Sequence, residues 1–284
     1  MKVGFIGLGT LGKTIARRMQ SEGVELVVWN RTREKCEEMR VPIAESPADL
    51  ISKTDLIFLN LTDSTAVCSI INGETGLAAG ASPGKIVVDT TTNHFGWVGS
   101  FYDTLDAVGA NYLEAPVLGS VVPASKGLLT VLISGDETSY NKARSLIETF
   151  GKNLFYLKER ALASKMKIIN NLTLGTFMAV LAEAVSLGES AGMEKDMILD
   201  ILSRGGGDSM VLNAKRDKLS REDFSNHFSS AMIYKDLHYL QDLARELHRP
   251  LLTATVVKEI FGMTFSKGWE NDDFSGVYRI FSEL

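Results

Sequence analysis

Residues 2–12 decide the fold of this chain, and they read KVGFIGLGTLG. The apolar residues of a short strand lead into a GxGxxG motif, and a helical pattern follows over Thr10–Ser21. In that setting the motif is typical of a dinucleotide-binding turn, because its glycines allow the tight turn and the close approach of backbone to pyrophosphate. The ligand's phosphates then face the helix N-terminus. We therefore predict a cofactor site that includes Gly7, Leu8, Gly9, Thr10, Leu11 and Gly12.

The end of the second predicted strand, Glu25–Trp29, indicates which cofactor is bound. An acidic residue at this place would bind the ribose 2′-hydroxyl of NAD, but the strand runs into Asn30-Arg31-Thr32. A guanidinium beside short polar side chains suits a 2′-phosphate by its charge and by the geometry of its donors. The sequence therefore predicts NADP(H), bound in part by Asn30, Arg31 and Thr32. The alternative, in which Arg31 only points to solvent, stays open at this point.

Strand and helix patterns alternate up to residue 157 and then give way to helices. The predicted strands are Lys2–Ile6, Glu25–Trp29, Asp55–Asn60, Lys85–Asp89, Asn111–Glu114, Leu128–Ser134 and Asn153–Leu157. This alternation predicts an α/β fold with a mostly parallel sheet. After Arg160 the pattern is helical to Leu284, beginning with a long helix over Ala161–Ser190. We predict an NADP-binding Rossmann domain over residues 1–160 and an all-helical domain for substrate binding and dimerisation over residues 161–284.

The composition of the chain argues against several classes of partner. Of its 284 residues 45% are hydrophobic, and the net charge of −5 comes from interspersed acids and bases. No basic block indicates nucleic acid or an anionic membrane, so a small-molecule partner is expected. The two cysteines and four histidines lack the spacing of a metal site, so none is predicted. The chain begins directly with the strand of the glycine motif, without a signal-peptide pattern, and a cytoplasmic location is expected.

Four further motifs lie outside the glycine turn. They are Asp89–Thr92, the segment Glu114–Gly127 that begins EAPVLGS, the helix start Ala161–Asn171, and Phe228 followed by Lys235-Asp236-Leu237. Together they resemble the β-hydroxyacid dehydrogenase family, which includes 3-hydroxyisobutyrate dehydrogenases and the glyoxylate and succinic semialdehyde reductases. The resemblance covers essentially the whole chain and leans toward the glyoxylate reductase branch.

The resemblance implies roles for particular residues. Catalysis would fall to Lys167, with Asn171 as its helper. Further cofactor contacts would come from Leu61, Thr62, Thr92, Phe228 and Lys235. The substrate would be bound by Thr92, Leu118, Gly119, Ser120, Lys167, Asn171 and Asp236.

The chain departs from the family pattern at three places. Leu118 stands where the family has a serine that hydrogen-bonds the substrate carboxylate, and an apolar side chain cannot supply that donor. The choice of substrate is therefore expected to be affected. Ala161 and Ala163 replace two glycines at the start of the catalytic helix. We expect both alanines to be tolerated, because the backbone there should be helical and alanine is the better helix former.

The chemistry of carbonyl reduction agrees with the choice of Lys167. Hydride arrival at a carbonyl carbon builds negative charge on the oxygen, which needs a proton donor within about 3 Å. Lys167 can donate that proton, and Asn171 lies one turn further along the same helix face. We expect NADPH-dependent reduction of a small carboxylate-bearing aldehyde or 2-oxo acid, such as glyoxylate or succinic semialdehyde, or oxidation of the matching hydroxyacid. An imine or bulkier carbonyl reductase and a non-catalytic NADPH-binding protein stay open as alternatives.

The C-terminal half carries an apolar face that includes Val256, Val257, Ile260 and Phe261. Such a face often packs against a second copy, so a homodimer or homotetramer is expected. The same residues fit the interior of a helical domain equally well, and the sequence does not decide between the two.

Overall fold

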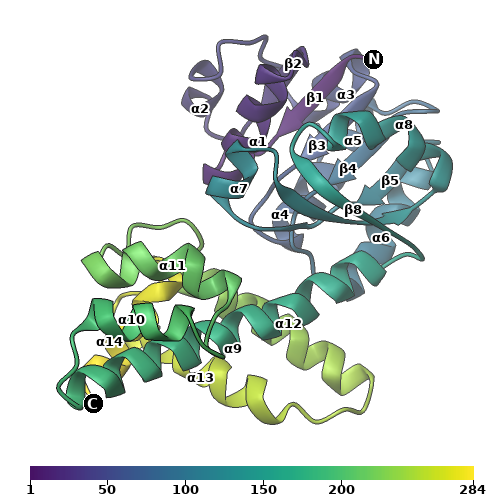
Figure 1. Cartoon of the computed structure of the whole chain (residues 1–284). Coiled ribbons are helices and arrows are strands. Elements are labelled where there is room, and N and C mark those ends of the chain that lie inside the picture. The colour runs from purple at the N-terminus through teal and green to yellow at the C-terminus, as the bar shows by residue number, and fades with distance from the viewer. The chain divides into compact units, whose positions relative to one another are not determined.

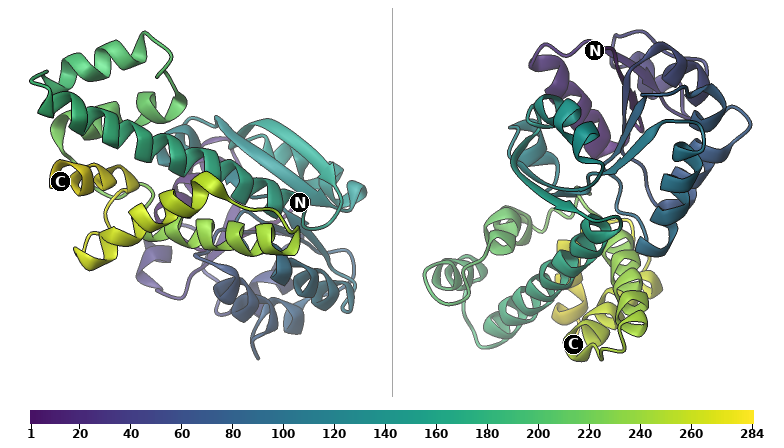
Figure 2. Two further views of the ribbon diagram at one scale, coloured as in Figure 1. Left: turned by 90° about the horizontal axis from the view of Figure 1, so that it is seen from below. Right: turned by 90° about the vertical axis from the view of Figure 1, so that its right-hand side faces the viewer.

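The computed structural model describes residues 1–284 and divides into two compact units. The first unit is Met1–Lys167 and the second is Ile168–Leu284. The division falls inside α9 (Leu162–Ser190), which Figure 2 shows as one uninterrupted helix. The predicted domain boundary, between residues 160 and 161, lies just before this helix begins.

A mostly parallel sheet forms the centre of the first unit (Figure 1). The strands are β1 (Val3–Ile6), β2 (Leu26–Trp29), β3 (Leu56–Leu59), β4 (Ile86–Asp89), β5 (Asn111–Glu114), β6 (Val117–Leu118), β7 (Leu129–Gly135) and β8 (Gly151–Lys158). Their order is β2-β1-β3-β4-β5-β7-β6, with β8 also paired to β7. Strands β1 to β5 are parallel, and only the pairs that β7 makes with β5 and β6 are antiparallel. The predicted fold class, a Rossmann domain followed by helices, is confirmed.

All seven predicted strands are present, with ends that differ from the prediction by one or two residues at most. The sequence did not predict β6, because two residues are too few to produce a recognisable alternation of apolar and polar side chains. This short strand pairs Val117 with Val131 and Leu118 with Thr130.

Two apolar cores lie on opposite faces of the sheet, because alternate strand residues point to opposite sides. Phe5 and Phe58 belong to one core, which α1 (Thr10–Ser21) and α8 (Glu137–Ile147) cover. The neighbouring Ile57 belongs to the other core. Burial on both faces explains why the central strands read as continuous apolar runs. The second core is covered by α3 (Pro47–Lys53), α4 (Ser64–Asn72) and α6 (Phe95–Asp106), and the shorter helices of the unit are α2 (Glu34–Glu37), α5 (Leu77–Gly80) and α7 (Val121–Ser125).

The second unit contains helices only. After α9 these are α10 (Lys195–Ser203), α11 (Met210–Arg221), α12 (Ser230–Glu246), α13 (Leu252–Ser266), the 3-10 helix η1 (Phe274–Val277) and α14 (Tyr278–Ser282). On α13, Val257 and Phe261 are buried, whereas Val256 is 61% exposed. The apolar residues singled out in the sequence are therefore divided between interior and surface, and the homodimer or homotetramer stays a prediction.

Helix α9 is the one helix long and apolar enough to cross a membrane by length and composition. In its most apolar window 44% of the residues are buried inside the structure. A core helix of a globular protein satisfies the same criterion, so this feature is weak evidence for a membrane span.

Candidate active site

The cofactor residues predicted in the first unit follow the carboxyl ends of its parallel strands. Because β1 to β5 run in the same direction, the segments after them lie along one edge of the sheet. This is the edge where open α/β sheets bind ligands. It holds the glycine motif, Asn30–Thr32, Leu61, Thr62 and Thr92, and the segment Leu118–Ser120 follows β5.

The glycine motif has the shape that a dinucleotide requires. Gly7 has a φ of +97°, and a Cβ atom added there would lie 2.1 Å from the backbone oxygen of Asn60. A Cβ atom on Gly12 would lie 2.0 Å from the backbone oxygen of Gly7. By contrast, nothing lies within 4 Å of a Cβ atom added to Gly9, so open space faces the backbone at this residue. Since no side chain caps the start of α1, its first N–H groups suit a pyrophosphate, and the site fits the cofactor.

Asn30 connects the end of β2 to the glycine motif. Its Oδ1 accepts a hydrogen bond of 2.9 Å from the backbone N–H of Leu8, and its Nδ2 donates one of 2.9 Å to the carbonyl of Thr32. Asn30 therefore fixes the shape of both loops. Arg31 and Thr32 beside it are exposed, as a group that binds a 2′-phosphate at the rim of the site would be.

The loops after β3 and β4 are tied together by Asn60, which the sequence did not single out, and by Thr90 and Thr91 of the Asp89–Thr92 motif. Asn60 Nδ2 donates to Thr90 Oγ1 at 2.9 Å, and the backbone N–H of Leu61 donates to Thr91 Oγ1 at 2.9 Å. The same Asn60 packs against the position where Gly12 lacks a side chain. A polar residue directly after the buried strand β3 was the available signal for this role.

Asp89, the last residue of β4, organises the segment that carries Thr92. Its carboxylate accepts hydrogen bonds from the backbone N–H of Thr91 at 2.8 Å, from Asn93 Nδ2 at 2.8 Å and from the Tyr112 hydroxyl at 2.7 Å. Burial raises the pKa of this carboxyl, and the hydrogen bonds oppose that rise. Asp89 is buried and Thr92 is half-buried, so the hydrogen bonds of Asp89 hold the segment on its buried side.

The segment after β5 holds Leu118, Gly119 and Ser120 in a constrained turn. Leu118 is half-buried on β6, and Gly119 has a φ of +116°. A Cβ atom on Gly119 would lie 2.7 Å from Cδ2 of Leu129, so no other residue fits without a shift of its neighbours. An apolar side chain thus stands at the position that the family resemblance assigns to the substrate carboxylate.

Helix α9 carries the two predicted catalytic residues one turn apart. Lys167 is 8% exposed and Asn171 is fully buried. Asn171 Nδ2 donates a hydrogen bond of 2.6 Å to Oδ2 of Asp236 on α12, and its Oδ1 accepts one of 3.2 Å from Asn170. The Lys235 ammonium lies 3.1 Å from the other oxygen of Asp236. The second unit therefore brings Asn171 next to Asp236, which lies 65 residues further along the chain beside Lys235.

Phe228 lies in the loop before α12, where the second unit fixes it firmly. Its backbone N–H donates to Oδ2 of Asp273 at 3.3 Å, and its carbonyl accepts from the N–H of Phe274 at 2.8 Å. The rings of Phe228 and Phe274 meet edge to face, with centroids 5.6 Å apart. The role of Phe228 toward the cofactor stays a prediction.

One expectation about the start of α9 is wrong. Ala161 has a φ of +67°, so its backbone is left-handed rather than helical, and the argument that alanine is the better helix former does not apply to it. Ala163 lies inside α9 and is buried, as that argument requires. The left-handed conformation favours glycine, the residue that the family has at this position.

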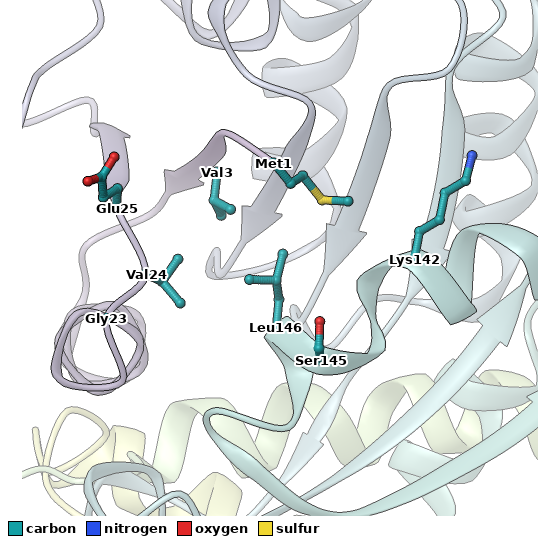
Figure 3. A pocket seen from close by; sticks show the side chains of 8 residues that line it. All are labelled: Met1, Val3, Gly23, Val24, Glu25, Lys142, Ser145 and Leu146. Carbon is teal, nitrogen blue, oxygen red and sulfur yellow. The ribbon is translucent and has the colours of Figure 1, made fainter.

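An open pocket of about 360 Å³ lies elsewhere in the first unit (Figure 3). Met1 and Val3 at the start of β1, Val24 and Glu25 before β2, and residues of α8 line it. These are the amino ends of the strands, opposite the edge that carries the glycine motif. The pocket contains none of the predicted site residues, and we assign it no role. No group of three or more histidine, cysteine, aspartate or glutamate side chains in the structure could hold a metal ion.

Curated relatives of the chain have two kinds of name. Cytokine-like nuclear factor N-PAC of Gallus gallus is 31% identical over 283 residues, which are 99% of this chain and 51% of the relative. The chain thus spans about half the length of the N-PAC relatives it matches. Glyoxylate/succinic semialdehyde reductase 2, chloroplastic, of Arabidopsis thaliana is 29% identical over 280 residues, covering 98% of this chain and 78% of the relative.

Solved structures match the chain along almost its whole length. A 3-hydroxyisobutyrate dehydrogenase from Salmonella typhimurium has a TM-score of 0.92 and 25% identity, covering 99% of this chain and 100% of the other. The protein Psf3, solved in complex with NADP+ and 2-OPP, has a TM-score of 0.92 and 27% identity, covering 98% and 99%.

Two family models account for both units of the chain. The model of the NAD binding domain of 6-phosphogluconate dehydrogenase matches residues 2–157, more than half of the chain. The model described as NAD-binding of NADP-dependent 3-hydroxyisobutyrate dehydrogenase matches residues 162–281. The fold, the glycine motif and these matches agree, and the chain belongs to the β-hydroxyacid dehydrogenase family of NAD(P)-dependent oxidoreductases.

Proposed function

We propose that this protein reduces a small carboxylate-bearing aldehyde or 2-oxo acid, with NADPH as hydride donor and Lys167 as general acid. The observation that carries the proposal is the pair Lys167 and Asn171, which lie buried one turn apart on α9. Burying an amide costs free energy unless it has partners, and Asn171 has them in Asp236 and Asn170. A buried lysine one turn away from this hydrogen-bonded amide supports a catalytic use.

The choice of NADP(H) follows from the end of β2. Arg31 is exposed there beside Thr32, and no acidic side chain takes the position that would bind a ribose 2′-hydroxyl. The loop is held by Asn30, which leaves the guanidinium of Arg31 to meet a 2′-phosphate. The NADP+ complex of Psf3 supports the same assignment.

The reaction needs one proton for each hydride. NADPH, when bound, supplies the hydride to the carbonyl carbon. The Lys167 ammonium donates a proton from Nζ to the carbonyl oxygen as the C–O double bond becomes single, which yields the alcohol and a neutral amine. Solvent then returns a proton to Nζ. In the reverse oxidation the neutral Lys167 takes the hydroxyl proton.

Asp236 determines which way the amide of Asn171 faces. Since Nδ2 of Asn171 donates to Asp236, the amide oxygen is held on the other side of the group. That oxygen accepts one hydrogen bond from Asn170 and has a second lone pair for another donor. An ammonium or a substrate hydroxyl is such a donor, so Asn171 can orient either one.

The substrate class is the less constrained part of the proposal. The Arabidopsis thaliana relative is named for glyoxylate and succinic semialdehyde, and we propose a substrate of that kind. Leu118, half-buried on β6, removes the serine donor expected for the carboxylate. The backbone of Gly119 and the side chain of Ser120 then supply the polar contacts to that end of the substrate. A cyclic imine is the competing substrate that Leu118 suggests.

Replacement of Lys167 tests the proposal. We expect Lys167→Ala to lower kcat with glyoxylate or succinic semialdehyde by about 100- to 10,000-fold, the usual contribution of a general acid. Binding of NADPH should stay within about threefold, because the lysine acts on the carbonyl oxygen. The measurement is the loss of reduced-nicotinamide absorbance, with NADPH and NADH each tested against both acids and a cyclic imine. Lys165→Ala, a half-exposed lysine on the same helix, is the matched control and should keep wild-type turnover.

Three results would change the proposal. Full turnover by Lys167→Ala would remove the lysine mechanism. Turnover of the imine alone would show that the substrate is an imine, bound where Leu118 replaces the carboxylate donor. Binding of NADPH without turnover of any compound would favour a non-catalytic protein.

A further inference from the structure

We propose that Glu114 is a positioning residue for catalysis, whose buried carboxylate fixes the first turn of α9 and thereby the place of Lys167. The inference rests on the proposed role of Lys167. Glu114 is the last residue of β5 and is 1% exposed. Its partners at the start of α9 lie 47 and 50 residues further along the chain.

Side chains of the sheet bind N–H groups in the first turn of α9. A helix start leaves its first N–H groups without partners inside the helix. Glu114 Oε1 accepts the backbone N–H of Ala161 at 2.7 Å, and Oε2 accepts the N–H of Ser164 at 3.0 Å and its hydroxyl at 2.7 Å. Ser134 Oγ takes the N–H of Ala163 at 3.0 Å. Glu114 on β5 and Ser134 on β7 therefore cap the start of the helix, beside the local bond from the N–H of Leu162 to the carbonyl of Glu159.

The surroundings of Glu114 leave these contacts little freedom. The hydroxyl of Tyr102 lies 3.1 Å from Oε1 and 3.0 Å from the carbonyl of Ser134, and its single proton is shared between them. The Arg160 guanidinium lies over the Tyr102 ring at 4.4 Å and pairs with Asp106 at 2.7 Å. Glu114 thus meets neutral donors and the positive end of the helix dipole.

These hydrogen bonds lie close enough to Lys167 along α9 to affect its position. Ser164 precedes Lys167 by three residues, so both lie on nearly the same face of α9, less than one turn apart. A carboxylate that holds the N–H groups of Ala161 and Ser164 fixes both the rotation of the helix about its axis and its distance from the sheet. Misplacement of a catalytic group by about 1 Å can cost 100-fold in rate.

Glu114 also begins the segment that leads to Leu118 and Ser120. The peptide that follows it is tied to the neighbouring strand, because the N–H of Ala115 donates to the carbonyl of Asp89 at 2.7 Å. One side chain therefore joins the proposed substrate segment to the helix that carries the proposed proton donor. A group that only stabilised the fold would not need to connect these two elements.

The test compares Glu114→Gln with Glu159→Gln, the same change at an exposed glutamate just before α9. We expect Glu114→Gln to lower kcat by about 10- to 100-fold, measured well below its unfolding temperature. The dissociation constant of NADPH should change by less than about threefold. The pH dependence of kcat should shift, because the proton donor is displaced. Ser164→Ala, which removes one bond, should lower kcat by a smaller factor and serves if Glu114→Gln does not fold. Unchanged kcat in both variants would overturn the proposal.

Amide hydrogen exchange separates this proposal from that for Lys167. Loss of the cap should speed exchange at Ala161, Ala163 and Ser164 in Glu114→Gln and leave Glu159→Gln unchanged, whatever the enzyme turns over. If Lys167→Ala is fully active, the proposed function fails, and faster exchange would still support Glu114 as the group that fixes α9. Unchanged exchange at these three residues would overturn the positioning role itself.

Discussion

Each unit contains a buried carboxylate that links segments far apart in the sequence, and the two carboxylates have different partners. In the first unit Glu114 accepts from N–H and O–H groups of Ala161, Ser164 and Tyr102. In the second unit Asp273 lies 2.9 Å from the ammonium of Lys215, which is itself 8% exposed. Asp273 also accepts from the backbone N–H groups of His227, Phe228 and Ser275.

The two arrangements have opposite effects on acidity. Burial raises the pKa of the Glu114 carboxyl, and its hydrogen bonds lower the pKa by less than burial raises it. Burial acts on Asp273 in the same direction, but the Lys215 ammonium and the Ser275 donors hold its pKa below the usual range. Neutral donors hold the Glu114 carboxyl in place although its pKa stays raised, whereas the Lys215 ammonium beside Asp273 helps to lower the pKa of that carboxyl.

Removing the cation should produce the largest effect on stability. Lys215→Met leaves Asp273 buried without its countercharge, and we expect the free energy of unfolding to fall by about 3–5 kcal/mol. The measurement is chemical denaturation. Lys267→Met is the control, because it breaks the exposed Lys267–Glu283 pair, for which a loss below about 1 kcal/mol is expected. The double variant Lys215→Met with Asp273→Asn should recover much of the loss. Equal losses for the two lysine variants would contradict the prediction.

Lowering the pH should change the contributions of the two carboxylates to stability in opposite directions. The lowered pKa of Asp273 means that its contribution is present above the unfolded value of about 3.9 and is lost as pH falls through the folded value. The raised pKa of Glu114 means that its contribution is present below the unfolded value of about 4.3 and is lost as pH rises through the folded value. The cost of Asp273→Asn should therefore shrink on acidification from neutral pH, and that of Glu114→Gln should grow.

Denaturation curves at a series of pH values measure both costs against the wild-type protein. Because each variant is compared with the wild type at the same pH, the titration of all other carboxyls cancels. A change of the same sign in both variants would contradict the comparison.

The smallest expected effect concerns the backbone at the Glu114 joint. Ala161 has a φ of +67°, a conformation that costs an alanine about 1–2 kcal/mol and a glycine little. Glycine also gains freedom in the unfolded chain, so we expect Ala161→Gly to raise the free energy of unfolding by no more than about 1 kcal/mol. Ala163→Gly, inside α9, should lower it by about 1 kcal/mol. A loss in both variants, seen in thermal or chemical unfolding, would show that Ala161 is not strained.

Most of the fold could be predicted because its signals are local. The glycine motif sits between β1 and α1 in eleven consecutive residues, and the buried strands read as apolar runs. The roles of Glu114 and Asp273 could not be predicted, because their partners Ala161 and Lys215 lie 47 and 58 residues away. The left-handed backbone of Ala161 was missed for the same reason, since it follows from that joint rather than from local propensity.

The candidate site was predictable to a similar extent. The family resemblance implied roles for Lys167, Asn171 and Asp236, and the structure adds that Asn171 and Asp236 share a hydrogen bond. The sequence did not reveal Asn60, which ties the loops after β3 and β4, nor that Asp89 of the Asp89–Thr92 motif holds the backbone of Thr91. A supporting residue of this kind is recognised by what it contacts, and contacts between strands appear only in the folded chain.

Because α9 passes the division between the two units without a break, the helix alone sets the spacing of Lys167 and Asn171. The separation of four positions amounts to about 6 Å of rise along the axis. The helix therefore fixes the separation between the backbone positions of the two residues. A single residue inserted between them would turn Asn171 by about 100° about the axis and destroy the register, whereas an insertion after Ser190 would leave it intact.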